Sequence, residues 1–512
     1  MSAVSPPDAK ILLTAAEAYP EFEAQMLDAQ DEVNCGFRIF DPWTQLVSDR
    51  AKAIGRDWFD LVTHTLKRGV SFKLLLTDFD PVARPEMHRD AWTSLRVLLA
   101  AGEASGRPDL LKVRVAMHPA RAGLMPRLML WPKIYKEHKE TVEKLNELSK
   151  EERIRAITEM PFLRPMVKWQ EDKLSVKALS VPQLFPATHH QKLAVFDRRR
   201  LYIGGLDLND RRFDTLEHDR PSSETWHDVQ ILVEGQAAID AHEHLETCMA
   251  VMDGRMNPPK SSLLRTMSAR RRWAFPHLAP RLVLSELSDA HLQAARRAEN
   301  LIYLETQYFR DRELADHLAG LANKKPDLSL IIILPAAPDD VAFENDINAD
   351  VEYGEYLQSE CMKTLRDGFG DRVFLGAPAQ RRRADSDGDD VHYDAPIIYL
   401  HAKVSIFDDR EAIVSSANLN GRSLKWDTEI GLRMERPADL KALKQRCFEH
   451  WLGQDAAPEF LDIKSACASW SSRAKRNAGR NPESREGFIL PYDISPSTKR
   501  GRNLPGVPEE MF

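Results

Sequence analysis

Two short motifs hold the residues of this chain whose types and spacing could do chemistry. One reads His190-Gln191-Lys192 and the other His401-Ala402-Lys403. A neutral imidazole can act as a nucleophile and a protonated one as a general acid, because the pKa of histidine lies near neutral pH. Two ammonium groups beside them could hold the oxygens of a phosphate and offset the charge that builds in a transition state. The residue types therefore suit two-step cleavage of a phosphodiester bond.

The two motifs belong to an internal duplication of the chain. The residues that follow them match in register and without a gap. The matched pairs are Asp197 and Asp408, Gly204-Gly205 and Ser415-Ser416, Asp207 and Asn418, Asn209 and Asn420, and Arg211 and Arg422. A buried, structural histidine could account for one such triplet, but matched flanks make this explanation weak for two. We therefore expect each half of the chain to bring one histidine and one lysine to a shared site.

The spacing within each motif predicts which residues face that site. Residues two apart on a β-strand point to the same face of the sheet, so each histidine should lie beside its lysine. Asp197 and Asp408 follow their histidines by seven residues, an odd number. On a continuous strand they would face away from the site. We therefore expect structural roles for both aspartates, such as salt bridges or bonds within turns.

Each half begins with the pattern strand, helix, strand. The segments are 37–40, 51–68 and 70–76 in the first half, and 301–305, 312–323 and 328–334 in the second. Short loops between such elements are typical of a parallel sheet with helices packed on it. A strand pair at each motif, a further strand and a helix complete each half. The sequence thus predicts an α/β fold of two similar halves, each a mixed and mostly parallel sheet flanked by helices, with one active site at their interface.

The halves differ by an insertion and are joined by a basic segment. The predicted divisions are an N-terminal half at 1–264 with an insertion at about 119–186, a basic linker at 265–280, a C-terminal half at 281–470 and a basic C-terminal tail at 471–512. The insertion contains an apolar segment at 124–131. Such a segment could dock at a bilayer surface, although packing in a core is the more frequent explanation. We expect the weakly periodic tail to be disordered or to wrap the surface.

Composition limits the class of protein. The chain has 512 residues, a formal net charge of −7 and 43% hydrophobic residues, which is ordinary for a globular protein. No apolar run approaches the roughly 18 residues typical of a membrane span, and residues 1–10 lack the pattern of a secretory signal. We therefore expect a cytoplasmic or peripheral membrane protein. Export by a route that needs no standard signal is the alternative. The acidic balance disfavours a nonspecific nuclease, although it is compatible with a local basic groove.

The chain resembles the phospholipase D superfamily, whose double His-x-Lys-(x)4-Asp motif it matches at both copies. The flanks extend the likeness with Gly-Gly-Leu-Asp-Leu at 204–208, Trp-His-Asp-Val at 226–229, Glu-Thr-Gln-Tyr-Phe at 305–309 and Ser-Ser-Ala-Asn-Leu-Asn at 415–420. One departure is Ser415, where the family usually has glycine. The resemblance covers about 33–455. It implies the two-half fold, one shared active site and a monomer that is complete by itself.

The resemblance also implies a role for each residue of the site. It implies that His190 is the nucleophile and His401 the general acid and base, although the spacing alone leaves their order open. It implies that Lys192 and Lys403 hold the phosphate, that Asp228 and Glu429 orient the histidines, and that Asn418, Ser416 and Asp207 bind the substrate. For Asp207 a structural bond is the alternative. Because the lysines supply the positive charge, we expect no metal and no cofactor in the reaction.

Three functions share these residues. The first is hydrolysis of a glycerophospholipid to phosphatidic acid and a free headgroup, with transfer of the phosphatidyl group to an alcohol as a second outcome. The second is a phosphatidyltransferase of the cardiolipin synthase kind, and the third is a nuclease of the same superfamily. We favour the first. The expected partner is a phospholipid membrane surface or a lipid substrate rather than nucleic acid.

Overall fold

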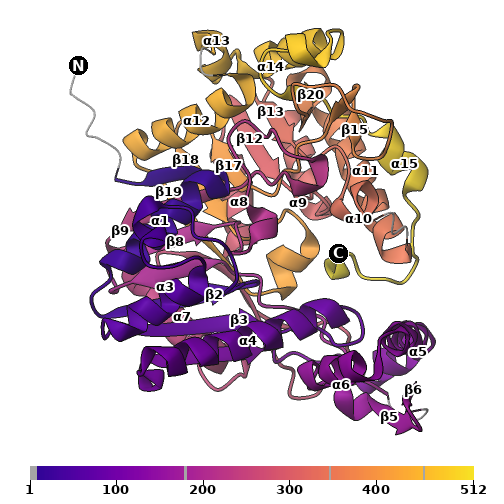
Figure 1. Ribbon diagram of the computed structural model, residues 1–512. Helices are drawn as coiled ribbons and strands as arrows, with labels where there is room; N and C mark the ends of the chain where they lie inside the picture. The colour runs from indigo at the N-terminus through magenta and orange to yellow at the C-terminus, as the bar shows by residue number, and fades with distance from the viewer. Residues whose placement is uncertain (1–7, 178–180, 345–347, 454–455) are drawn as a thin grey trace.

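Each half of the chain is built around one large β-sheet (Figure 1), and the computed structural model describes residues 8–177, 181–344, 348–453 and 456–512. The first sheet has the strand order β1 (Lys10–Leu13), β9 (Val229–Glu234), β8 (Arg200–Gly204), β7 (Leu193–Phe196), β2 (Glu32–Phe37), β3 (Ser71–Thr77) and β4 (Leu111–Ala116). The second has the order β11 (Arg281–Ser285), β10 (Leu264–Ala269), β19 (Glu429–Met434), β18 (Glu411–Ser415), β17 (Lys403–Phe407), β12 (Leu301–Thr306), β13 (Ser329–Ile333), β14 (Val373–Pro378) and β20 (Ile489–Pro491). The predicted α/β architecture of two mixed sheets is therefore confirmed.

The prediction that the sheets are mostly parallel is wrong. Parallel pairing is limited to β2-β3-β4 in the first sheet and β12-β13-β14 in the second. The other neighbouring strands in both sheets pair antiparallel. The strand pairs that carry the motifs, β7-β8 and β17-β18, are joined by tight turns. A parallel pair would need a long crossover between its strands, so these pairs must be antiparallel.

Helices flank both sheets. The first half has α1 (Thr14–Asp28), α3 (Trp58–Lys67), α4 (Pro85–Ser105) and α7 (Gln236–Met252), and the second has α8 (Glu286–Arg297), α9 (Arg312–Ala322), α11 (Ala349–Phe369), α12 (Pro437–Leu452) and α14 (Ala466–Ala478). Short elements complete the fold: α2 (Asp49–Lys52), α10 (Asp339–Ala342), α13 (Pro458–Leu461), α15 (Ser495–Arg500) and the pair β15 (Val391–His392) and β16 (Ala395–Pro396). None of the helices among the described residues is long and apolar enough to cross a membrane.

One apolar core joins the two halves. It contains Val195 and Ile203 from the motif strands of the first sheet, and Val404 and Val414 from those of the second. All four side chains are buried. Because burial of apolar surface is the main force that drives association of such faces, the two sheets are packed as one unit around the ends of their motif strands.

The segment predicted as a C-terminal tail is part of the second half. Helix α14 extends through Ala478, and β20 then pairs antiparallel with β14 as the last strand of the second sheet. The strand has only three residues, which is too short for its apolar pattern to stand out in the sequence. It covers an edge that would otherwise present unpaired backbone groups.

The segment predicted as a basic linker also begins inside the second sheet. Strand β10 pairs with β19 on one side and β11 on the other. Its charged residue Arg265 is buried, and the Nε of Arg265 donates a hydrogen bond to Glu286 Oε2 at 2.9 Å. This ion pair explains why a polar sequence can form a strand inside the sheet, since buried charges require partners.

The insertion forms a lobe at the edge of the molecule, at the lower right of Figure 1. It consists of α5 (Leu124–Glu147), α6 (Lys150–Glu159) and the hairpin of β5 (Val167–Gln170) and β6 (Lys173–Val176). A small core of its own, which includes Val142, Ile157 and Leu163, holds these elements together. The lobe therefore stands beside the sheets and does not extend either of them.

Replacement of Ile489 by alanine tests whether the C-terminal strand belongs to the core. Ile489 is fully buried in the core shared by the two halves, so Ile489→Ala should lower the free energy of unfolding by roughly 2–5 kcal/mol. Denaturant titration measures the loss. The matched control is Ile239→Ala on α7, where 52% of the residue is exposed and a change within about 0.5 kcal/mol is expected. Equal stability of the two variants would contradict the assignment.

Candidate active site

The two motif histidines lie where segments of opposite halves cross. His190 stands shortly before β7, and its backbone N–H donates to the carbonyl of Thr428, next to β19, at 2.9 Å. His401 stands shortly before β17, and its N–H donates to the carbonyl of His227, next to β9, at 2.8 Å. In both halves, therefore, the segment before the motif strand is hydrogen-bonded to a segment of the other half. These two bonds bring the motifs together at the interface.

Each histidine takes its carboxylate from the other half. His190 Nδ1 lies 2.8 Å from Glu429 Oε1, and His401 Nδ1 lies 2.7 Å from Asp228 Oδ2. Both acids were named from the sequence, but nothing in the sequence indicated that the pairs are crossed. With Nδ1 bonded, the Nε2 atom of each imidazole is left for a substrate. Such a bond to a carboxylate fixes the tautomer and orientation of the ring.

Residues at matched positions support the two acids differently. Ser416 Oγ donates to Glu429 Oε2 and lies fully buried. The matched position in the first half is Gly205, where a Cβ atom would lie 2.4 Å from Asp228 Oδ1. Glycine is therefore required there, because the shorter Asp228 carboxylate occupies the space. In this structure the Ser416 hydroxyl orients Glu429, and its contact with the substrate stays a prediction.

The two lysines lie beside their histidines, buried below the surface. Lys192 Nζ donates to the backbone carbonyl of His190 at 2.8 Å and lies 3.7 Å from Asp207 Oδ2. Lys403 Nζ donates to the backbone carbonyl of His401. Each ammonium group therefore has a fixed position next to an imidazole and retains donors for a bound anion.

Asp207 and Asn418, the next matched pair, have different surroundings. Asp207 Oδ1 accepts the backbone N–H groups of Arg38 and Ile39, at 3.1 and 3.0 Å. Asp207 thus holds the segment after β2 and lies beside Lys192 as a counter-charge, which fits the structural bond given as the alternative for this residue. Its role in substrate binding stays a prediction. Asn418 Nδ2 donates to Gln307 Oε1 at 3.2 Å, while its Oδ1 has no partner among the described residues.

Burial shifts the protonation of the whole site. Burial, together with the charges of Lys192 and Lys403, holds the pKa of His190 and of His401 well below the usual value. Burial also raises the pKa of Asp228 to about 7 and that of Glu429 to about 8, and lowers the pKa of Lys403 to about 7. Both imidazoles are therefore neutral near pH 7, the form in which Nε2 can attack. Since both lysines act on both histidines, the two motifs form one site.

Several site residues were missed by the sequence analysis. The charges of Arg38 and Arg422 bear on His190, and the ring of Trp226 lies 4.6 Å from that of His401. Arg212 lies over the ring of Trp226, with Cζ 3.6 Å from the ring centre. The match of Arg422 with Arg211 in the duplication was a signal for a basic residue near the site. Arg38 carried no such signal.

The motif aspartates lie at the turns and not at the site. Asp197 accepts the backbone N–H groups of residues 30–32, and Asp408 accepts those of residues 299–301. Both have a φ of 51°, a left-handed conformation that aspartate tolerates in turns. Each carboxylate therefore fixes the start of the central strand, β2 or β12, against the hairpin of its motif.

The chain is similar in sequence to known proteins. Residues 291–451, which include the second motif and Glu429, match the family model described as "Cardiolipin synthase, PLD-like domain". Phospholipase D alpha 1 of Cynara cardunculus is 23% identical over 384 aligned positions, and that of Vigna unguiculata is 24% identical over 385. Each alignment covers 52% of this chain and 47% of the relative, so the chain spans about half the length of these relatives.

A solved structure is also similar. The crystal structure of phosphatidylserine synthase from Haemophilus influenzae Rd KW20 aligns with 86% of this chain and 85% of its own, with a TM-score of 0.49 and 12% sequence identity.

Proposed function

Because the chain belongs to the phospholipase D superfamily, we propose that it is a phospholipid phosphodiesterase that works through a covalent phosphohistidine. Its main reaction is hydrolysis of a glycerophospholipid to phosphatidic acid and a free headgroup. The observation that carries this proposal is the pair of buried histidines, each with Nδ1 bonded to a carboxylate of the other half and Nε2 left for a substrate.

In the first step of the proposed reaction, Nε2 of His190 attacks the phosphorus atom. A bond from this nitrogen to phosphorus forms, and the bond from phosphorus to the headgroup oxygen breaks. His401, neutral in the free site, takes up a proton when the anionic phosphate binds and gives that proton to the headgroup oxygen. In the second step His401 takes a proton from water. The hydroxide attacks phosphorus, the bond to nitrogen breaks, and phosphatidic acid leaves with His190 restored.

Charge on the phosphate is balanced by the chain itself. Lys192 and Lys403 sit beside the two imidazoles and supply two cations for the non-bridging oxygens, and Asn418 offers a further polar contact. Glu429 and Asp228 stabilise the imidazolium that forms on either ring during the cycle. The scheme needs no cofactor. Both halves lie in one chain, so a monomer supplies the complete site.

Transfer to an alcohol is the second candidate reaction. The matched family model carries the description of a cardiolipin synthase, which favours an alcohol as the second substrate. In this version an alcohol replaces water in the second step, and every residue keeps its role. A nuclease is disfavoured by the net charge of −7, because a protein that binds polyanions without specificity requires an excess of basic surface.

A phospholipid surface is the proposed partner. Large apolar side chains are exposed on two segments. Those at the start of the insertion are Leu124, Met125, Leu128 and Met129 on α5, and those on the segment after β10 are Trp273 and Phe275. The two segments adjoin, since the N–H of Gly123 donates to the carbonyl of His277 at 2.8 Å. Exposed arginines at 270 and 272 flank this apolar patch. Apolar side chains next to basic ones suit contact with anionic lipid.

The reaction is tested by incubation with mixed phospholipid micelles and a little ethanol, with products identified by mass spectrometry. Phosphatidic acid supports hydrolysis, and phosphatidylethanol supports a covalent intermediate. His190→Ala and His401→Ala should each lower turnover by at least about 10³-fold, and Glu429→Gln by roughly 10²-fold with the fold intact. His64→Ala on α3 is the matched control. Intact lipid beside degraded single-stranded DNA in a parallel reaction would overturn the proposal.

Lys403 gives the reaction a dependence on pH. Its ammonium form is populated below its pKa of about 7 and is lost above it, so kcat/KM should fall as the pH rises from 7 to 9. In Lys403→Arg the cation persists at high pH, and the decline should become shallower. A decline of the same steepness in this variant would show that Lys403 does not contribute to it.

The apolar patch is tested with Trp273→Ser combined with Phe275→Ser. Binding to anionic phospholipid vesicles should weaken by at least about tenfold, because two exposed aromatic side chains are removed from the contact. Turnover of a short-chain lipid that stays monomeric should not change. Cosedimentation with vesicles and initial rates measure the two effects. Ile239→Ser, at an exposed site on α7, is the control, and an equal loss of binding in this control would contradict the assignment.

A further inference from the structure

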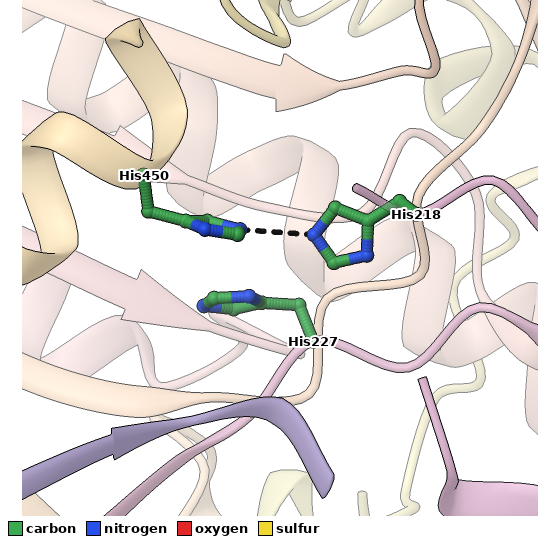
Figure 2. Close-up of side chains that lie close together, drawn as sticks. All are labelled: His218, His227 and His450. Atoms are coloured by element: carbon green, nitrogen blue, oxygen red, sulfur yellow. Dashed lines mark hydrogen bonds between the residues drawn. The ribbon is translucent and has the colours of Figure 1, made fainter. Parts of the chain in front are cut away.

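Three histidines lie close together, with the rings of His218 and His227 buried and that of His450 half-buried (Figure 2). His227 stands just before Asp228, which precedes β9; His450 lies near the end of α12, and His218 lies in the segment between β8 and β9. His218 Nε2 and His450 Nε2 are 2.9 Å apart, and one nitrogen from each of the three rings lies within 4.8 Å of the others. The reaction described above uses none of these three side chains.

We propose that His218, His227 and His450 bind a zinc ion and that the carboxylate of Glu305, which lies beside His227, turns in as the fourth ligand. Three imidazoles and one carboxylate are a ligand set that zinc favours, and four protein ligands close the coordination sphere as in a structural site. In a tetrahedral site with ordinary zinc–nitrogen bonds the ligand atoms lie roughly 3.3 Å apart. The spacings among the three histidine nitrogens, from 2.9 Å to at most 4.8 Å, bracket this value. Glu305 Oε2, 3.5 Å from His227 Nε2, has to turn toward the other two rings.

The carboxylate of Glu305 supports the fourth position. Glu305 Oε1 accepts the hydroxyl of Tyr303 at 2.6 Å and the indole N–H of Trp451 at 3.1 Å. Glu305 Oε2 has no hydrogen-bond partner among the described residues and lies 3.5 Å from His227 Nε2. The two ring nitrogens of His227 are likewise without a partner within the described part of the chain. Leaving buried polar atoms unpaired is costly, and a cation between them removes that cost.

A second carboxylate orients one of the ligands. Asp214 Oδ2 lies 2.6 Å from His218 Nδ1, and both side chains are fully buried. This bond fixes the tautomer of His218 with Nε2 free and aimed at His450. A carboxylate on the far nitrogen of a histidine is the usual support for a metal-bound imidazole. Asp214 is therefore a positioning residue for the proposed ion.

The proposed ion would link the two halves and would not take part in the chemistry. His218 and His227 come from the first half, while His450 and Glu305 come from the second. The carbonyl of His227 accepts the N–H of His401, and the next residue in the chain is Asp228. The ion would thus hold in place the segment that supplies the partner of His401.

The test is zinc binding by the 512-residue chain, measured independently of lipid turnover. The purified protein is stripped with a chelator and dialysed against Zn²⁺, and bound metal is counted by mass spectrometry. We expect one equivalent in the wild type, with affinity from competition against a zinc-sensitive dye. His218→Asn and His450→Asn should bind at least about 100-fold more weakly, and Asp214→Asn roughly 10- to 100-fold more weakly. His242→Asn, outside the cluster, is the control.

Two further readouts decide the outcome if a variant folds poorly. Zinc should raise the thermal midpoint of the wild-type protein but not that of His218→Asn, and Co²⁺ should give the visible absorption of a tetrahedral nitrogen and oxygen site. The proposal is overturned if the wild type retains no stoichiometric zinc and its thermal midpoint does not respond to the ion. The cluster would then be a set of hydrogen-bonded histidines without a metal.

Discussion

The crossed pairing of histidine and carboxylate is the constraint on which the rest of the structure depends. His190 is bonded to Glu429 and His401 to Asp228, so each half holds the acid that the other half requires. A buried carboxylate without its partner would carry a large desolvation cost. Neither half can therefore be satisfied alone, and the apolar core between the motif strands forms at the place where both pairs close.

Duplication supplied two similar halves, but the two imidazoles do not have the same surroundings. The carboxylate of Glu429 takes a hydroxyl from Ser416, whereas Asp228 lies against Gly205, where there is no side chain. His401 packs on Trp226, and the charge of Arg212 bears on it, while Arg38 bears on His190. A nucleophile and a general acid need different proton affinities, and differences in environment are the means by which a protein separates them. The departures from symmetry thus fit a cycle in which the two histidines do different work.

From the sequence it could be predicted that the two motifs meet at one place, but not which residues each histidine contacts there. The spacing of histidine and lysine predicted a shared face, and the odd spacing predicted that Asp197 and Asp408 lie elsewhere, because both follow from the period of a strand. The crossed pairs could not be predicted, since one sequence holds no distance between its halves. Strands β10 and β20 were missed because tertiary contacts define them: Arg265 is neutralised by Glu286, and β20 is formed by pairing with β14.

Adjacent residues on one short segment serve two regions of the interior. The side chain of Asp228 faces His401, and that of His227 faces the opposite way, toward His450 and Glu305. Successive side chains of an extended segment alternate, so a residue that supports the catalytic pair necessarily has a neighbour directed into the core behind it. The backbone of His227 also accepts the N–H of His401. A displacement of the histidine cluster would therefore move Asp228 as well, and the packing of α12 against the first half helps to keep Asp228 aligned with His401.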